Sequence, residues 1–355
     1  MHIPDGYLSP ATCGALYLGA APFWYTALHR LKKVLHSRVV PLISLFSAFS
    51  FILMMFNLPL PGGTTGHAVG IGVATIVLGP WAAILSISMA LVIQAIFFGD
   101  GGVTAIGANC FNMAVVGSFV SYATYRLVSG GAPITATRRV IAAGLAGYLG
   151  INASALCAAI EFGIQPIFYH DAAGAPLYCP YPLSIAIPAM MIGHLTIAGF
   201  AELFVSAGIV AFLQKTDPAL LRTTARLPIV SRDREGAVGN ATRKLWAALA
   251  LLLVLSPLGI LAAGSAWGEW VASDFTDPHT RGQMATASLS QPPPTQAPSG
   301  LARLSTVWTA PIARYAPPYI RSAGFGYFLS ALFGTGLLIL AWLAIGRWMP
   351  GANQS

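Results

Sequence analysis

Charged residues are scarce in this chain of 355 residues. Lys, Arg, Asp and Glu together make up 8% of the sequence, whereas an ordinary soluble domain carries about 25%. Apolar residues make up 56%, and the mean hydropathy is +0.70. So few charges cannot cover the surface of a soluble globule. The composition therefore excludes a cytosolic enzyme and a disordered chain, and it predicts an all-α polytopic membrane protein.

Several chemical motifs are also missing. No GxxxxGK[ST] phosphate loop occurs, so we expect no ATPase in the chain itself. The absence of HExxH and of a Ser or Cys nucleophile motif further indicates that the chain is not an enzyme. The four cysteines lack CxxC spacing, and we interpret the first three, Cys13, Cys110 and Cys157, as small hydrophobic residues. The net charge of +8 comes from basic residues in short loops, which indicates membrane topology and not nucleic-acid binding.

Apolar stretches long enough to approach the thickness of a bilayer recur along the chain. A helix needs about 17–25 residues to cross about 30 Å of hydrocarbon. The sequence predicts nine spans, at 9–28, 39–58, 66–79, 80–98, 103–127, 138–161, 183–213, 245–264 and 324–346.

The positive-inside rule orients these spans. With the N-terminus outside, all but four of the 19 Lys and Arg residues fall in inner loops. Treating 66–98 as one helix would instead place the loop from Arg126 to Arg139 outside. This favours a break at Gly79-Pro80, where proline clashes with a continuing helix. We therefore expect an extracytoplasmic N-terminus and a cytoplasmic C-terminus in the inner membrane.

The spans divide the chain into two modules. Residues 1–215 form a predicted seven-helix transmembrane block, and residues 216–244 form a basic cytoplasmic linker. Residues 245–355 form a two-helix transmembrane hairpin with an extracytoplasmic loop at 265–323. The Pro-rich stretch Gln291–Gly300 in this loop is expected to be extended or disordered.

The N-terminus itself has the chemistry of a metal chelator. The chain opens without a basic segment before its first apolar run, so we expect no signal peptide and a free α-amine on Met1. Met1 supplies this amine, and His2 supplies a backbone amide nitrogen and an imidazole. Three nitrogens at adjacent positions would close small chelate rings. Square-planar nitrogen coordination with a displaced amide proton is typical of Cu(II) or Ni(II).

A glycine-rich loop on the same predicted side ends in a second histidine. Its sequence is Pro61-Gly62-Gly63-Thr64-Thr65-Gly66-His67. His67 is a candidate for the fourth nitrogen, and Thr64 and Thr65 are candidates to surround the ion. A polar residue at a helix boundary is the alternative interpretation of either histidine alone.

A second predicted outer loop, Gly99–Gly102, is followed by two amide side chains inside the predicted span 103–127. Asn109 and Asn112 are three residues apart and therefore share one helix face. They are candidates to orient His67 or the N-terminal segment. A structural amide network without any role at a ligand is the alternative.

Two ionisable residues lie within the predicted span 183–213. Carboxylates inside a membrane are costly and often functional. His194 and Glu202 are therefore candidates for a proton relay or for metal binding, although eight residues separate them. A hydrogen bond between helices or a contact with a partner subunit is the alternative, and it is the one we favour.

Three separated motifs resemble the NikM/CbiM family, the substrate-capture components of energy-coupling factor transporters for nickel or cobalt. They are Met1–Pro10, Pro61–His67, and Gly99–Gly102 leading to Gly107–Ala114. The resemblance covers about residues 1–215. It implies a transported Ni²⁺ or Co²⁺ bound by the Met1 amine, the amide and imidazole of His2, and His67. It also implies a transmembrane coupling subunit and a pair of cytoplasmic ATPases as partners.

The C-terminal module resembles the NikN/PDGLE-type accessory module. Ser256–Gly259 and Gly264–Trp270 carry this likeness. The name-giving Pro-Asp-Gly-Leu-Glu string is absent, and its nearest counterpart, Pro298–Ala302, lacks the acidic residues.

The sequence thus predicts the substrate-binding membrane subunit of an ATP-driven nickel or cobalt importer, with square-planar geometry favouring nickel. Two alternatives stay open at this point. One is a self-sufficient, ion-coupled carrier that uses Glu202 and His194. The other is a membrane metal sensor that never transports.

Overall fold

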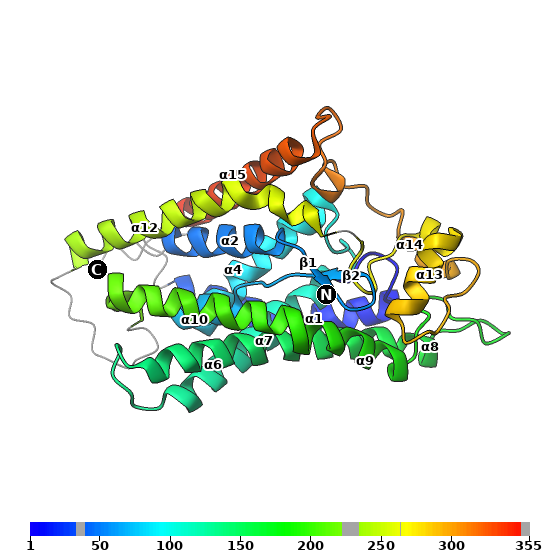
Figure 1. Ribbon diagram of the computed structural model, residues 1–355, viewed down its shortest axis with the longest axis horizontal. Helices are drawn as coiled ribbons and strands as arrows, with labels where there is room; N and C mark the ends of the chain where they lie inside the picture. Colours follow the sequence, from blue (N-terminus) through cyan, green and yellow to red (C-terminus); the bar gives the residue numbers. More distant parts are fainter. Residues whose placement is uncertain (33–39, 222–233, 263, 349–355) are drawn as a thin grey trace.

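The computed structural model describes residues 1–32, 40–221, 234–262 and 264–348. Most of its long helices run roughly along the long axis of the molecule (Figure 1). The middle of the predicted linker 216–244 and the predicted inner-loop residues Lys33 and Arg38 lie outside the described residues.

The N-terminal part of the chain is helical apart from one hairpin. Its α-helices are α1 (Pro10–Lys32), α2 (Val40–Met54), α3 (Ile71–Leu78), α4 (Pro80–Ile93), α5 (Ile106–Asn109), α6 (Gly117–Ser129), α7 (Thr137–Gly163), α8 (Gln165–Phe168), α9 (Leu183–Gly193) and α10 (Gly199–Thr216). Three π-helical turns, η1 (Gln94–Phe98), η2 (Cys110–Val116) and η3 (His194–Ala198), continue α4, α5 and α9.

Short helices connect two long helices in the C-terminal part. The elements are α12 (Arg234–Leu255), α13 (Pro278–Ala287), α14 (Ser299–Leu304) and α15 (Ala323–Trp348), with 3₁₀ turns η4 (Pro218–Leu221), η5 (Ser256–Leu261), η6 (Ala272–Phe275) and η7 (Ala313–Tyr315).

Among the described residues, six helices are long and apolar enough to cross a membrane. They are Pro80–Phe98, Ile106–Ser129, Thr137–Phe168, Leu183–Thr216, Arg243–Leu261 and Ala323–Arg347. Each overlaps one of the nine predicted spans. The predicted spans 9–28 and 39–58 overlap α1, which has 23 residues, and the shorter α2, which has 15.

The segment predicted to span the membrane over 66–79 is not a full-length helix. Its helix, α3, has eight residues, a length of about 12 Å, which is less than half the hydrocarbon thickness. Residues 67–70 before it form no helix or strand, and Gly70 adopts a left-handed φ of 78°, a conformation that glycine reaches at little cost. The predicted break at Gly79-Pro80 is confirmed, since α3 ends at Leu78 and α4 begins at Pro80.

A small antiparallel hairpin stands at one end of the helices. Strand β1 (Leu58–Leu60) pairs with β2 (Thr64–Gly66), with Leu60 opposite Thr64. The turn uses Gly62 and Gly63, both with positive φ. A parallel bridge between Thr65 and Ala266 adds the C-terminal loop to the hairpin.

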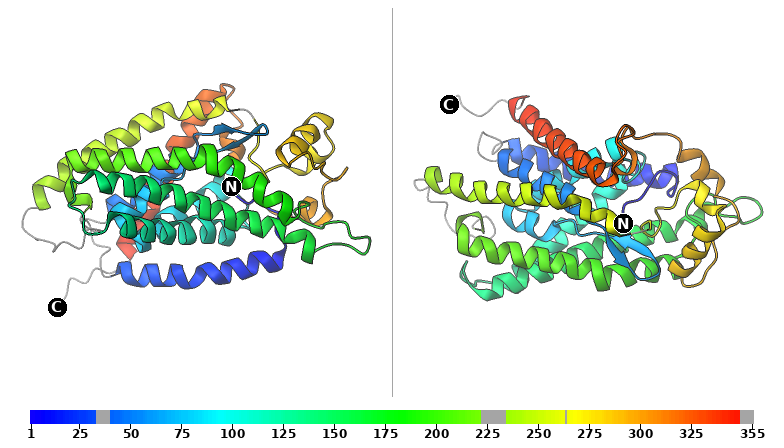
Figure 2. Two further views of the ribbon diagram at one scale, coloured as in Figure 1. Left: turned by 60° about the horizontal axis from the view of Figure 1, so that its bottom comes forward. Right: turned by 45° about the horizontal axis from the view of Figure 1, so that its top comes forward.

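The C-terminal helices pack on the N-terminal part. Helix α15 packs against α2, and α12 packs against α2 and α15. The Trp342 ring donates a hydrogen bond to Ser47, and the Tyr327 hydroxyl donates one to the Met55 carbonyl. Close approach requires Gly259, because a Cβ there would lie 1.9 Å from the Met55 oxygen. The loop between α12 and α15 therefore reaches the end of the molecule that holds β1 and β2 (Figures 1 and 2).

The structure agrees with the sequence analysis on the cysteines and on most of the Pro-rich stretch. All four cysteines are free; Cys13 and Cys110 are buried, and Cys157 is half-buried. Residues 291–298 contain no regular helix or strand, and α14 begins at Ser299.

Candidate metal centre

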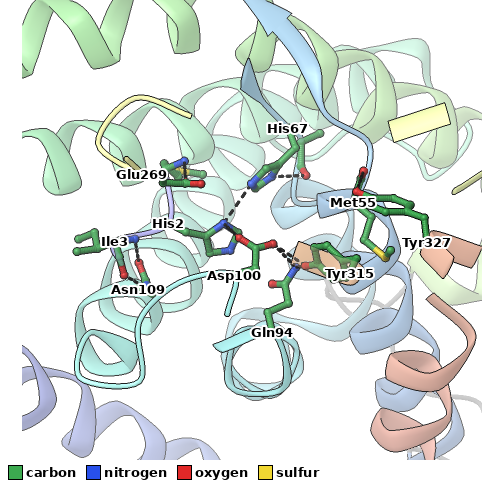
Figure 3. Close-up of polar contacts among 12 residues, drawn as sticks. His2, Ile3, Met55, His67, Gln94, Asp100, Asn109, Glu269, Tyr315 and Tyr327 are labelled. Carbon is green, nitrogen blue, oxygen red and sulfur yellow. Dashed lines mark hydrogen bonds and ion pairs between the residues drawn. The ribbon is translucent and has the colours of Figure 1, made fainter. Parts of the chain in front are cut away.

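The first residues of the chain are buried inside the protein. Met1 is 3% exposed, His2 is 1% exposed and Ile3 is fully buried. Asn109 binds the backbone of Ile3 at two points: its Oδ1 accepts from the Ile3 N–H at 2.8 Å, and its Nδ2 donates to the Ile3 carbonyl at 3.1 Å. The Gly102 N–H donates to the same carbonyl at 2.8 Å. These bonds hold the N-terminus in one place and direction (Figure 3).

The loop after η1 is shaped to receive this segment. The Asp5 carboxylate accepts hydrogen bonds from the backbone N–H groups of Val103 and Thr104 and from the Thr104 hydroxyl. Gly102 allows the close approach, because a Cβ there would lie 2.3 Å from the Asp5 nitrogen. Gly101 has a φ of +82°, and a Cβ there would lie 2.9 Å from the Asn109 amide nitrogen. The glycines of this motif therefore make room for the N-terminus.

His67 is fixed between the hairpin and α3. It follows β2 directly, and the residues after it are held by Glu202, whose carboxyl oxygens accept hydrogen bonds from the N–H groups of Val69 and Gly70 at 2.8 Å and of Gly72 at 3.2 Å. The His67 Nδ1 lies 3.1 Å from the Ala68 carbonyl. A carbonyl only accepts, so Nδ1 carries the proton and Nε2 presents a lone pair.

A ring nitrogen of His67 and a carboxylate oxygen of Asp100 meet at Nδ1 of His2 (Figure 3). The His67 Nε2 lies 3.3 Å from the Nδ1 of His2, and that Nδ1 lies 3.0 Å from Oδ1 of Asp100. The two groups that face His2 Nδ1, which are His67 Nε2 and the Asp100 carboxylate, are both hydrogen-bond acceptors. A positive centre, either a proton on Nδ1 or a cation, therefore lies between them. We call Met1, His2 and His67, with Asp100 beside them, the nitrogen cluster.

The remaining atoms of the nitrogen cluster are poorly satisfied. The buried Nε2 of His2 has no hydrogen-bond partner among the described residues, and no described residue accepts a hydrogen bond from the His2 amide. The Met1 amine lies 3.5 Å from a Glu269 carboxylate oxygen. The amine, the amide nitrogen and the Nδ1 of His2 could close small chelate rings around one cation, whereas Nε2 lies on the far side of the ring and could not reach the same ion.

Two residues of the C-terminal loop reach the nitrogen cluster. Glu269 pairs with the Met1 amine, and the Tyr315 hydroxyl lies 2.5 Å from Oδ2 of Asp100. Gln94 of η1 donates to both Tyr315 and Asp100. Tyr315 also stacks on Phe98, with ring centroids 4.8 Å apart. The C-terminal module therefore forms one wall around the N-terminus.

Burial and nearby charges determine the protonation states of Asp100, Glu269 and Tyr315. Burial by itself raises the pKa of the Asp100 carboxyl, but the rings of His2 and His67 and the Tyr315 hydroxyl together hold this pKa below its usual value. Burial raises the pKa of Glu269, and the Met1 ammonium opposes that rise. Burial and the Asp100 charge raise the pKa of Tyr315 far above its usual value. Tyr315 therefore stays protonated and donates its hydrogen bond to an ionised Asp100.

Side chains alone do not make a metal site here. Among the described residues, no group of three or more His, Cys, Asp or Glu side chains is arranged to hold a metal ion. A metal site at the nitrogen cluster would therefore need the two main-chain nitrogens of Met1 and His2 as well as the imidazoles.

The four residues predicted to surround the ion lie in different places. Asn109 holds the N-terminal segment directly. Asn112 instead donates to Glu161 at 2.7 Å. The Thr64 hydroxyl donates to the Pro61 carbonyl at 3.4 Å, and the Thr65 N–H donates to the Ser265 carbonyl at 3.2 Å. The threonines thus support the hairpin and its contact with the C-terminal loop.

His194 and Glu202 do not form a hydrogen bond with each other in the described structure. The His194 Nδ1 lies 2.9 Å from the Met190 carbonyl, one helical turn away. Glu202 is fully buried, and its two oxygens are occupied by the backbone N–H groups that follow His67. The interpretation of Glu202 as a packing hydrogen bond between helices agrees with these contacts, whereas a relay between the two residues does not.

Comparison with known proteins identifies the family. Residues 2–220 match the sequence model of CbiM, described as a cobalt uptake substrate-specific transmembrane region. A fused nickel transport protein NikMN of Rhodobacter capsulatus is 56% identical over 339 residues, which cover 96% of this chain and 95% of that protein. The chain belongs to the CbiM/NikM family. It is therefore a multi-pass membrane protein of a transport family.

Other CbiM/NikM relatives agree in sequence and fold. A cobalt transport protein CbiM of Geobacter sulfurreducens is 29% identical over 284 residues, which cover 78% of this chain and 76% of that protein. A crystal structure of a transition metal transporter superposes with a TM-score of 0.58 at 47% identity, covering 64% of this chain and 99% of that chain.

Three residues near the nitrogen cluster were not singled out from the sequence. Asp100 lies in the glycine-rich stretch Gly99–Gly102, and Glu269 lies in the stretch that resembles the accessory module of CbiM/NikM proteins. Both were therefore inside recognised motifs. Tyr315 lies in a long loop with no such signal, and only the folded chain brings it to Asp100.

Proposed function

We propose that this chain is the substrate-binding membrane subunit of an ATP-driven energy-coupling factor importer of Ni²⁺ or Co²⁺. The ion would bind at the extracytoplasmic side through the Met1 amine, the amide and imidazole of His2, and the imidazole of His67. Supporting relatives are named for nickel transport and for cobalt transport.

The observation that carries the proposal is the meeting of His2 and His67 beside a buried N-terminal amine. Two nitrogen ligands at about 2.0 Å from one metal and at right angles lie about 2.8 Å apart. The observed 3.3 Å between His2 Nδ1 and His67 Nε2 needs only a small contraction. The positive centre between them would then be the transported ion in place of a proton.

Charge balance supports a divalent ion at this place. Displacing the His2 amide proton leaves one negative charge, and the ionised Asp100 next to the ring supplies a second. A 2+ ion would then be neutralised inside a buried site, where unpaired charge is costly. Nickel suits the planar set of four nitrogens better than cobalt.

Ion release would follow from protonation and movement. These nitrogens bind metal only when deprotonated, so lower pH weakens binding. The transmembrane coupling subunit and the cytoplasmic ATPase pair would reorient the protein and present the site to the cytoplasm. The missing phosphate loop in this chain agrees with ATP hydrolysis on partner subunits.

The domain arrangement follows from the same proposal. Residues 1–215 would form the metal-binding block of seven membrane segments, and residues 245–355 would form the hairpin with the outer loop 265–323. The short α3, with the non-helical residues 67–70 before it, would serve as the third segment. The N-terminus would be extracytoplasmic, and the C-terminus cytoplasmic.

The test measures nickel and cobalt binding to the purified protein by calorimetry and visible absorption. The native chain is compared with one that carries an extra Ala before Met1, and mass spectrometry verifies each N-terminus. The insertion keeps every side chain and moves only the free amine. We expect the planar Ni²⁺ absorption band to disappear and the affinity to fall by about 100-fold or more.

A matched control separates this effect from general disturbance. An Ala inserted between Gly130 and Gly131, in the turn between α6 and α7, should leave nickel binding unchanged. Equal nickel affinity of the native and the N-terminally extended chains would contradict the proposal. Metal binding without uptake in vesicles that contain the coupling partners would indicate a sensor.

A further inference from the structure

A groove of about 410 Å³ is open between α10 and α12, and none of its lining residues belongs to the nitrogen cluster. Its volume is within the range of small-molecule sites, roughly 300–1,000 Å³. Its walls are apolar and come from three helices. They include Leu45 and Phe49 of α2, Phe204 and Phe212 of α10, and Leu245 and Leu252 of α12.

The groove exists because its two walls pack on different neighbours. Helix α12 packs against α2, while α10 packs against α3 and α7. Gly208 of α10 faces the groove without a side chain, and a Cβ there would meet nothing within 4 Å. The space is therefore open and has room for an apolar ligand.

Both walls end in basic residues at the same end of the molecule. Arg243 and Lys244 are exposed and directly precede Leu245 on α12. Lys215 is exposed and follows Phe212 by three residues on α10. Helix α10 ends where α12 begins, at the end far from β1 and β2 (Figures 1 and 2). An apolar channel with a cationic mouth matches an amphiphile that has an acyl chain and an anionic headgroup.

The groove suits an acyl chain better than a partner helix. Close packing of membrane helices uses small residues at the interface. Here the walls carry large side chains, and Phe204 is 68% exposed. A flexible hydrocarbon chain adapts to such walls. Basic pockets between membrane helices are known to hold anionic headgroups.

We propose that this groove binds an anionic phospholipid, with an acyl chain between α10 and α12 and the phosphate against Arg243, Lys244 and Lys215. The site is separate from the nitrogen cluster. Its occupancy does not depend on the transported ion.

The test is native mass spectrometry of the full chain in detergent, titrated with dioleoylphosphatidylglycerol or dioleoylphosphatidylcholine. The unchanged protein should retain the anionic lipid more tightly. Gly208→Trp fills the groove and should reduce retention of both lipids. Gly14→Trp is the matched control, because Gly14 lies on the exposed surface of α1 and also has nothing within 4 Å of a Cβ. It should bind lipid like the unchanged protein.

The headgroup contact is tested by removing charge. Arg243→Gln with Lys244→Gln should lower the preference for the anionic lipid by about 30-fold, since each basic residue near an anionic surface contributes about 1 kcal/mol. Lys244→Gln alone should lower it less. Lys32→Gln, at the exposed end of α1, should leave it unchanged.

Melting temperature and nickel affinity are recorded for each variant, so that misfolding is recognised. Lipid retention that is equal in Gly208→Trp and the unchanged protein would overturn the proposal. So would a Gly208→Trp protein that keeps its lipid but no longer assembles with the coupling subunit, because the groove would then be a protein interface. A preference that survives loss of both Arg243 and Lys244 charges would overturn the headgroup assignment.

Discussion

Two buried polar regions lie on either side of the segment 67–72, and they differ in how well their atoms are satisfied. In the nitrogen cluster, His2 Nε2 has no described partner, and ring nitrogens and a carboxylate face one another at 3.0 and 3.3 Å. At Glu202, both carboxyl oxygens accept backbone N–H groups of Val69, Gly70 and Gly72. The histidines of the nitrogen cluster and Glu202 are all at most 5% exposed.

This difference teaches that burial of an ionisable group does not by itself mark a ligand site. A buried carboxyl group with full hydrogen bonding stabilises the chain around it. Buried nitrogens whose hydrogen bonds are long or unmade leave free energy to be gained from a cation. Glu202 supports the segment after His67, so one region positions the other. The following changes test this division, from the largest expected effect on nickel affinity to the smallest.

Removing a ring nitrogen should have the largest effect. His67→Ala deletes one proposed ligand, and we expect nickel affinity to fall by more than about 100-fold, beyond the loss typical of an outer partner. Isothermal titration calorimetry measures the change. His194→Ala is the control, because the His194 Nδ1 faces the Met190 carbonyl of its own helix and no described residue of the nitrogen cluster forms a hydrogen bond with its ring. Similar losses of nickel affinity in the two variants would mean that His67 is not a specific ligand and would remove the distinction between the nitrogen cluster and Glu202.

Loosening the N-terminal segment should have the second-largest effect. Asn109→Ala removes both hydrogen bonds to Ile3 while all proposed ligands stay in the chain. We expect a loss of nickel affinity of about 10–100-fold, as is common for residues that orient ligands. Asn152→Ala serves as control, since Asn152 donates to the Tyr148 carbonyl of its own helix. An unchanged affinity in Asn109→Ala would show that the N-terminus needs no support from α5.

Removing the hydroxyl of Tyr315 should have a smaller effect. Tyr315→Phe deletes the hydrogen bond to Asp100 and keeps the ring stacked on Phe98. The bond to a charged group contributes about 1.5 kcal/mol, so we expect roughly a tenfold loss of nickel affinity. Tyr181→Phe is the matched control, because its buried hydroxyl has no described hydrogen-bond partner. A Tyr315→Phe protein with unchanged affinity would mean that the C-terminal loop covers the site without tuning Asp100.

Glu202→Gln should have the smallest effect on nickel affinity and a clear effect on stability. The glutamine amide would point an N–H group at backbone donors, which costs about 2 kcal/mol. We expect a lower melting temperature by about 5 °C, with nickel affinity changed by less than threefold relative to the unchanged protein. Loss of nickel uptake at an unchanged melting temperature would instead favour a proton relay and reverse the comparison.

Hydropathy predicted most of the fold because lipid-facing and buried helices are both apolar. Within the described residues, six of the nine predicted spans overlap helices that are long and apolar enough to cross a bilayer. Hydropathy failed at 66–79, where the residues are apolar but only 71–78 form a helix. The reason is tertiary: Glu202, more than 130 residues away, binds the N–H groups that a helix over this segment would have used.

The candidate site was only partly readable from sequence. Asn109 and Asn112 look equivalent on a helix face, yet the π-helical turn η2 begins at Cys110 and changes the register between them. Asn109 therefore meets Ile3, and Asn112 meets Glu161. Spacing rules assume a regular helix, so they cannot separate the two roles.

The sequence by itself determined the class of the protein and the proposed ligands. A charge content of 8% requires a membrane, and an N-terminal Met-His with one histidine after a glycine-rich loop limits which nitrogens are available. Only the tertiary structure decided which groups surround them. Asp100, Glu269 and Tyr315 come from loops far apart in the chain, and their meeting at the N-terminus results from α12 and α15 packing on α2. The residues of a segment determine which ligand atoms it can offer, whereas long-range packing determines which other side chains surround those atoms.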